Sequence, residues 1–383
     1  MTPGSIGRRE LLALAAGCSS ATLAGCGYQP GAGDYDWSHR VRHGPTRAIH
    51  SSDGVWLGDG DHLYGVANVS GRTHDFDTGQ WEDLNEAFVS AYDSAGDEQW
   101  SIGTGHQYVG DPVVADGTLY LALEDDTLAA VGPGSDEEGT VRWTAPCGHN
   151  GDHLEVAAGS GLVATVGSSE IHGFDPDTGD RRFAVDLPNE STEPSVAAGE
   201  YVWVASSPRD TDPELVIFDL DGTRTTRSLP DVVQWLEATG DRALAALEDG
   251  TVRGFDAHGD PQFDRSIEPD SSVPAVVGDR VYLESNGRLV ALDTVSGERH
   301  WDHDSPFDGP IVADEDGVYG WTSGSGCGFA AVDSDGDRWW EATAPDEVSC
   351  SDDLFVVDDR LVVGTNSNLY GFRKSPGRRY TLL

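Results

Sequence analysis

The feature that most constrains the fold is a short phrase that recurs about every 40 residues. In the version ALDTVSGERHW, which runs from Ala291 to Trp301, a small and an aliphatic residue precede an Asp, a turn Gly follows, and a Trp ends the phrase. The Asp position falls at residues 93, 132, 175, 219, 256, 293, 333 and 373, although Gly132 and Arg373 replace the Asp. A period of this length built from short strands is typical of propeller blades.

Each repeat predicts four strands. Three runs rich in β-branched or aromatic residues, Pro274–Val277, Arg280–Glu284 and Arg288–Leu292, are separated by Gly, Asn and Asp turns, and a fourth run ends on Trp301. Such a pattern predicts a four-stranded antiparallel meander, which needs neighbours like itself to bury its faces. Eight versions of the phrase predict an all-β, eight-bladed propeller, with seven blades as the fallback.

The first residues after the N-terminal region are expected to close the ring. Trp37 is followed by Gly44-Pro45, as Trp301 is followed by Gly309-Pro310, so residues 35–42 match an outer strand. The inner strands of that blade would come from residues 353–372, which removes the open edge of the ring. Tyr380, near the C-terminus, competes for the same place.

The repeated phrase resembles the pyrroloquinoline-quinone (PQQ)-like repeat over about residues 37–380. Within that family the chain is similar to the single-domain lipoproteins of the outer-membrane assembly factor B type, in a halophilic archaeal form. The resemblance implies the propeller fold. It does not name the function, because one fold hosts unrelated activities.

The charge balance excludes some partners and indicates a salty environment. The chain has 67 acidic against 24 basic residues, a formal net charge of −43, and one lysine, Lys374. A charge of this size opposes binding to nucleic acid or to an anionic membrane surface. At molar salt the Debye length is about 3 Å, so the repulsion is screened. We therefore expect a halophilic protein.

The N-terminal region predicts export. Arg8-Arg9 and the leucines that follow resemble a twin-arginine motif, and Leu23–Cys26 resembles a lipobox. We expect residues 1–25 to be a lipoprotein signal peptide, Cys26 to carry the lipid, residues 26–34 to be a tether and residues 35–383 to be the propeller. Cys18 is a weaker lipidation candidate, and the apolar run is short for a membrane-spanning anchor. The protein is then expected on the extracytoplasmic face of the cell membrane.

Two polar segments, Ser70–Glu86 and Ser206–Glu214, interrupt the repeat and are interpreted as insertions. In an up-and-down blade, the second-to-third-strand loops and the blade-to-blade connections share one face of the disc. Insertions gathered on one face favour a binding role, although loops also lengthen without function. The residues predicted to bind a partner there are Trp81, His106, Tyr108, His149 and His153.

The other recurring residues are given structural roles. The repeated Trp, Phe and Tyr of the outer strands are expected to pack between blades. The repeated Asp is expected to accept backbone N–H groups in a turn. Asp219–Gly222 and Asp333–Asp337 resemble fragments of calcium loops, but hairpin turns explain both without metal.

No catalytic residue is predicted, because the sequence lacks a nucleophile elbow, a zinc-protease helix, a phosphate loop and a cytochrome motif. It also lacks the adjacent cysteine pair that many PQQ-dependent dehydrogenases carry. We therefore predict a monomeric, non-enzymatic binding or scaffold module without a cofactor, whose partner is a protein or an envelope polymer. The alternative is an exported quinoprotein oxidoreductase with a divergent pocket for PQQ and calcium.

The cysteines add one further prediction. Export permits disulfides, and Cys327 and Cys350 fall on loops of the same disc face in or beside the seventh blade. A bridge between them is expected, and Cys147 would remain a free thiol.

Overall fold

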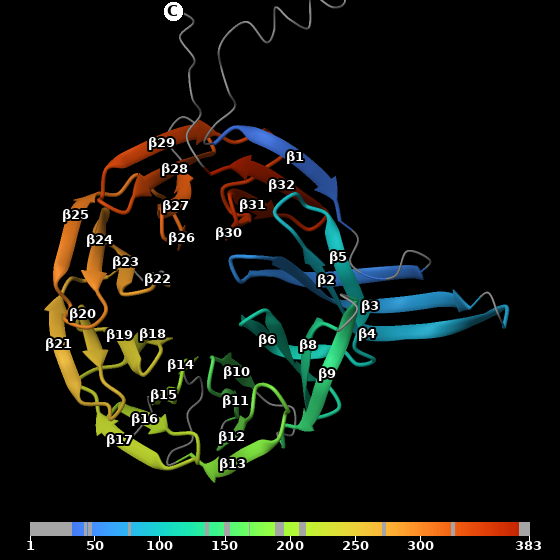
Figure 1. Ribbon diagram of the computed structural model, residues 1–383, viewed down its shortest axis with the longest axis horizontal. Helices are drawn as coiled ribbons and strands as arrows, with labels where there is room; N and C mark the ends of the chain where they lie inside the picture. The colour runs from blue at the N-terminus through green and yellow to red at the C-terminus, as the bar shows by residue number, and fades with distance from the viewer. Residues whose placement is uncertain are drawn as a thin grey trace, which may run out of the picture.

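The computed structural model describes residues 33–374 except 42–43, 45–47, 76–77, 135–137, 149–153, 168, 188–194, 207–211, 270–272 and 323–325. Across these residues the regular structure is β-strand, arranged as eight four-stranded antiparallel sheets. The sheets stand around a central axis as the blades of an eight-bladed β-propeller (Figure 1). The predicted fold class and blade count are therefore confirmed.

Blades one to four follow the chain from the inner to the outer strand. Their strands are β2 Ala48–Gly58, β3 Leu63–Asp75, β4 Gln80–Tyr92 and β5 Glu98–Gly103; β6 Tyr108–Ala115, β7 Thr118–Leu123, β8 Thr127–Pro133 and β9 Gly139–Pro146; β10 Glu155–Ala158, β11 Val163–Val166, β12 Glu170–Phe174 and β13 Arg181–Asp186; β14 Ser195–Ala198, β15 Val202–Ser206, β16 Glu214–Phe218 and β17 Arg224–Ser228.

Blades five to seven continue in the same order, and blade eight takes its outer strand from the start of the chain. Their strands are β18 Val233–Thr239, β19 Arg242–Leu247, β20 Thr251–Phe255 and β21 Pro261–Ser266; β22 Ala275–Val277, β23 Arg280–Ser285, β24 Arg288–Asp293 and β25 Arg299–Asp304; β26 Ile311–Ala313, β27 Gly317–Thr322, β28 Gly328–Asp333 and β29 Arg338–Thr343; β30 Asp353–Val357, β31 Arg360–Gly364, β32 Asn368–Arg373 and β1 Tyr35–Arg40.

The N-terminal strand closes the ring, as the position of Trp37 predicted. Strand β1 pairs antiparallel with β32, and beside it Gly33 N–H donates to the Arg373 carbonyl at 2.7 Å. Asp36 accepts from the guanidinium groups of Arg360 at 3.0 Å and Arg373 at 2.7 Å. Two cations on one half-buried carboxylate fix β1 to the inner strands of its blade. Tyr380 lies outside the described residues.

The repeated aromatic residues join neighbouring blades. The indole N–H of Trp37, Trp143, Trp301 and Trp340 reaches a turn carbonyl in the next blade, at Ser94, Pro176, Ser334 and Lys374, over 2.9–3.1 Å. Glycine is needed where the ring lies flat on that turn. At Gly179 a Cβ atom would stand 2.5 Å from the Trp143 ring, and its φ of +73° also favours glycine.

The repeated Asp residues order the turns between third and fourth strands. In each such turn one carboxylate oxygen accepts two backbone N–H groups; the residues are Asp93, Asp175, Asp219, Asp256, Asp293 and Asp333. Hydrogen bonds from Ser296 lower the pKa of Asp293, and the Arg182 guanidinium lowers that of Asp175. The role predicted for this Asp is confirmed.

Blade one departs from the sequence interpretation. Ser70–Glu86 was expected to be an insertion outside the four-strand repeat, but β3 and β4 run through it as an uninterrupted antiparallel pair from Leu63↔Tyr92 to Asp75↔Gln80. The two strands extend beyond the ring (Figure 1). We call residues 68–87 of this pair the projecting hairpin. Its residues are mostly polar on both faces, so the sequence lacks the apolar–polar alternation by which a strand is recognised.

Candidate partner-binding surface

One face of the projecting hairpin carries a ladder of polar cross-strand contacts. Three pairs directly opposite each other make it: Ser70 Oγ with Asn85 Oδ1 at 3.1 Å, Arg72 Nε with Asp83 Oδ1 at 3.3 Å, and the rings of His74 and Trp81 with centroids 5.1 Å apart. Arg72 and Asp83 are exposed, and Trp81 is 52% exposed. These contacts order side chains that otherwise face solvent.

The opposite face of the hairpin is partly apolar. Val69 and Leu84 are buried, and with Ala67 and Phe88 they form a small cluster beside the main core. Buried apolar residues on one face and the polar ladder on the other both stabilise the extended strand pair. The hairpin is therefore an ordered extension of the sheet of blade one.

The connection from blade one to blade two covers the base of the hairpin on the ladder face. Tyr108 N–H donates to Asn68 Oδ1 at 2.8 Å, and the Asn68 amide donates to the Tyr108 carbonyl at 2.9 Å. Gln107 Nε2 donates to Ser70 Oγ at 2.8 Å. The ladder therefore continues without a break from Trp81 near the tip to residue 108 in the ring.

The structure places three of the five predicted partner-binding residues on this surface. Trp81 is near the hairpin tip, while His106 and Tyr108 belong to the connection at its base. His106 Nε2 is 3.3 Å from Asp125 Oδ2, on the turn between β7 and β8. His149 and His153 lie outside the described residues. Arg72 and His74 belong to the segment that was interpreted as an insertion, and together with Asn85, which the sequence interpretation did not select, they complete the ladder. The pairing of Asn85 with Ser70 depends on the strand register, which the sequence does not show.

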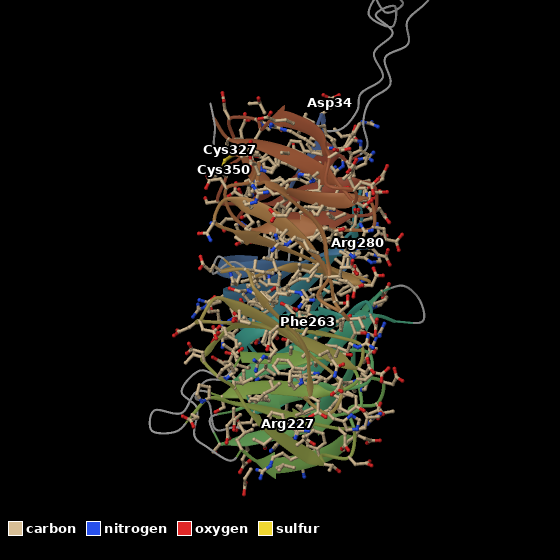
Figure 2. All side chains as sticks on the ribbon, turned by 90° about the vertical axis from the view of Figure 1, so that its left-hand side faces the viewer. Asp34, Arg227, Phe263, Arg280, Cys327 and Cys350 are labelled. Atoms are coloured by element: carbon tan, nitrogen blue, oxygen red, sulfur yellow. A yellow bond between two sulfur atoms is a disulfide. The ribbon has the colours of Figure 1, made fainter. Side chains whose placement is uncertain are left out.

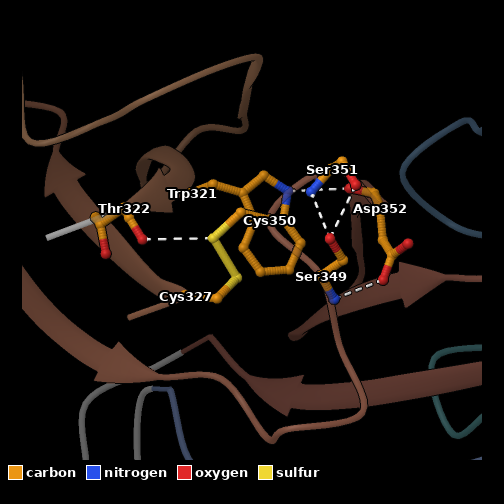
Figure 3. The surroundings of a disulfide bond; sticks show 7 residues. All are labelled: Trp321, Thr322, Cys327, Ser349, Cys350, Ser351 and Asp352. Carbon is orange, nitrogen blue, oxygen red and sulfur yellow. Dashed lines mark hydrogen bonds between the residues drawn. A yellow bond between two sulfur atoms is a disulfide. The ribbon is translucent and has the colours of Figure 1, made fainter. Parts of the chain in front are cut away.

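A second feature of the same disc face is the disulfide between Cys327 and Cys350, whose Cα atoms are 5.4 Å apart (Figures 2 and 3). It joins the connection after β27 to the connection before β30. The indole of Trp321 donates to the Asp352 carbonyl at 3.0 Å, and Asp352 accepts from Ser349 N–H at 2.8 Å. Arg280 marks the opposite face in Figure 2. Cys147 is a buried free thiol.

The axial cavity does not suit PQQ. A cavity of about 470 Å³ opens between the inner strands of blades one, six, seven and eight, with Val276, Ile311 and Phe355 on its walls. Its charged lining residues are Asp59, Asp314 and Asp358, whereas PQQ is a tricarboxylate that needs cationic partners.

The lysine that lies against Asp314 of this cavity is already engaged in ion pairs. Lys374 is buried and forms ion pairs with Asp314 and, at 3.0 Å, with Asp316. These hydrogen bonds raise the lysine pKa. The described residues include no cluster of three or more His, Cys, Asp or Glu side chains that could hold a metal ion.

One carboxyl group of the inner ring has an unusual protonation equilibrium. Glu237 is partly buried on β18, and loss of hydration raises its pKa to about 7. A group of this pKa can exchange a proton near neutrality.

Among the described residues there is no helix with the length and apolar character required to span a bilayer. The family model of the outer membrane protein assembly factor BamB matches residues 85–182 and 248–381. No curated protein sequence matches the chain.

Three solved structures were found to be similar to this chain. BamB from Moraxella catarrhalis is 16% identical with a TM-score of 0.54, covering 89% of this chain and 97% of that chain. Sqt1 from Saccharomyces cerevisiae is 8% identical with a TM-score of 0.50, covering 80% and 92%. Quinohemoprotein alcohol dehydrogenase from Comamonas testosteroni is 13% identical with a TM-score of 0.44, covering 91% and 78%. These likenesses concern the fold alone.

Proposed function

Because the chain belongs to the family of the outer membrane protein assembly factor BamB, we propose that it is an extracytoplasmic binding or scaffold propeller. Its partner, a protein or an envelope component, docks on the ladder face of the projecting hairpin. The observation that carries this proposal is the continuous polar surface from Trp81 to the connection at Gln107 and Tyr108. Aromatic and Arg side chains on such a surface are the usual anchors of protein interfaces.

The N-terminal segment supports a membrane location for this module. We propose that the twin-arginine signal with Arg8 and Arg9 exports the chain, and that lipid on Cys26 then holds it at the membrane. Each buried CH₂ of the lipid contributes about 0.8 kcal/mol, which offsets the repulsion between a chain of charge −43 and an anionic bilayer. The same charge supports a protein adapted to molar salt.

The anchor is tested by fractionation. Cys26→Ser should move the protein from the membrane fraction into the soluble fraction after a carbonate wash, while Cys18→Ser leaves it in place. A Cys26→Ser protein that stays with washed membranes would contradict the anchor and would leave the docking surface untouched.

The docking surface is tested by shortening the hairpin. Gly71 and Leu84 are directly opposite each other, so residues 72–83 can be replaced by Asn-Gly, the turn that joins β23 to β24 in blade six. This change removes Trp81, His74 and the Arg72–Asp83 pair but keeps Val69 and Leu84. Cross-linking in native membranes at high salt should then lose the partner that the full chain captures.

The matched control lies on the other disc face. Leu220 is an exposed apolar side chain on the turn between β16 and β17, and Leu220→Ala should leave capture unchanged. Capture that survives hairpin shortening and the double change Trp81→Ala with Tyr108→Ala would place the site elsewhere on the ring.

A further inference from the structure

The projecting hairpin has an open strand edge. Strand β5 pairs with β4 only from Phe88 to Tyr92, and the connection to blade two covers Ala87. Over Gln80–Glu86, no described strand pairs with the edge of β4 that faces away from β3. Figure 1 shows this part of β4 outside the ring with no neighbouring ribbon on that side.

The backbone groups of this edge can be assigned. Ala87 N–H donates to the His106 carbonyl at 2.7 Å and the Ala87 carbonyl accepts from Thr104 N–H at 2.9 Å, so both groups of Ala87 point away from β3. Because outward and inward residues alternate along an antiparallel strand, Asn85, Asp83 and Trp81 also direct their N–H and carbonyl groups outward. Glu82, Leu84 and Glu86 direct theirs to β3.

The side-chain contacts agree with this assignment. Residues opposite each other come closest where the two do not exchange backbone hydrogen bonds. The three ladder contacts join Asn85, Asp83 and Trp81 to their partners on β3. These are the same three residues whose backbone groups face outward.

We propose that a partner binds by adding an extended strand to this edge of β4, and that the segment it adds is rich in Lys or Arg. This inference rests on the proposed docking surface and specifies the mode of binding. The outward groups of Trp81, Asp83 and Asn85 supply main-chain hydrogen bonds, as in other cases of strand addition. The added strand would place its side chains beside the ladder on one face and beside Leu84 on the other.

The negative charge of this strand edge favours a basic partner strand over a second copy of this chain. Glu82 and Asp83 are exposed on β4, and Glu86 lies at the end of the open stretch. A second copy of this chain would bring these carboxylates against their own counterparts, which destabilises directly opposed positions. A basic strand meets the same carboxylates favourably and gains orientation from them.

The probe for the test is a synthetic ten-residue peptide of alternating Arg and Val, added to the full mature protein in molar KCl. Amide hydrogen exchange should slow about tenfold at Trp81, Asp83 and Asn85, while Glu82, Leu84 and Glu86, whose amides already bond to β3, stay unchanged. A peptide of alternating Glu and Val should have no effect. Uniform slowing along β4, or none, would overturn the proposal.

Two proline variants separate strand addition from side-chain docking. Asp83→Pro and Asn85→Pro each remove an outward N–H without breaking a bond to β3, so peptide affinity should fall at least about tenfold. Asp83→Ala removes the same carboxylate and the Arg72 ion pair but keeps the N–H, and should bind within about threefold of the parent. Retained slow exchange at Leu84 shows that the hairpin is intact in the proline variants.

Capture of the native partner by these variants distinguishes the proposed docking surface from the proposed strand addition. If hairpin shortening abolishes capture but the proline variants capture normally, strand addition is wrong and the docking surface stands. If the shortened protein also captures normally, the docking surface itself is wrong. Self-association that the proline variants abolish would replace the basic partner by a second copy.

Discussion

The hairpins joining second and third strands in blades one and six occupy the same place in the repeat but differ in length. In blade six, β23 and β24 have six residues each and meet through Asn286-Gly287, both with positive φ, which is the favoured chemistry of a two-residue hairpin. In blade one, β3 and β4 have 13 residues each and leave the ring.

This difference shows how one blade of a repeat protein gains an exposed extension. The short hairpin of blade six places Tyr282 and Leu283 between neighbouring blades, where both are buried. The long hairpin begins in the same way, with Tyr64 and Val66 buried, and then continues where no blade can cover it. The same strands therefore supply core at one end and an open edge at the other.

The largest effect is expected where two regular blades meet. Phe263 of blade five is buried and lies against Gly297 of blade six. Phe263→Ala should lower the free energy of unfolding by about 4 kcal/mol, because it removes a ring and leaves a cavity. Denaturant unfolding in molar salt measures the loss. A change below about 1 kcal/mol would mean that the blades do not depend on this contact.

The next largest loss of stability is expected on removing the disulfide bond. The disulfide between Cys327 and Cys350 links two loops of the ring, whereas the projecting hairpin contains no cysteine. Replacing both cysteines by alanine should cost about 3 kcal/mol, since the bridge restricts a loop with a sequence separation of 23 in the unfolded chain. Mass spectrometry of unreduced mature protein should find these two thiols protected; free Cys327 and Cys350 would contradict the bridge.

A smaller effect on stability is expected from a buried carboxyl group of the ring, and this effect depends on pH. Burial raises the pKa of Glu237 from 4.5 to about 7, so the folded state favours the protonated carboxyl. Stability should therefore be full below pH 4.5, fall as pH rises towards 7, and stay low above it. Glu237→Gln should stabilise the protein at pH 8 by about 2 kcal/mol and change little at pH 4. An equal effect at both values would exclude this cause.

The smallest effect on folding is expected on the hairpin. Trp81 is half exposed, so Trp81→Ala should change the free energy of unfolding by less than about 0.5 kcal/mol while weakening partner capture. Unfolding curves and cross-linking yields measured on the same samples test this contrast with Phe263. A loss of stability above about 2 kcal/mol would show that the hairpin is part of the core.

The regular blades could be predicted from the sequence because the signals for turns, strands and repeats all indicate the same fold. Gly278 and Gly287 mark turns, aliphatic runs mark strands, and the spacing of the Asp and Trp residues gives the repeat. Even the closure by residues 35–40 followed from a single motif, the Trp37 phrase.

The candidate site was harder to recognise because its residues break the hydrophobic pattern. Between Ser70 and Glu86 most residues are polar on both faces of the strands, so the segment resembled a loop. Contacts across the ladder, such as Ser70 with Gln107, depend on a register that the sequence does not display. The same holds for Lys374 and Asp316, which come from different blades.

The pairing of β1 with β32 also has a consequence for biosynthesis. Tyr35 lies opposite Phe372 in the register, so the first strand of the ring cannot pair until the residues of β32 have been made. Blade eight cannot be completed on the ribosome while residues 353–373 are still inside the exit tunnel. Before then, blades one and seven lack the neighbour that blade eight provides, and a chain that stops before residue 350 would stay an open arc. Ring closure therefore follows the synthesis of the other seven blades and of the strands from β30 to β32.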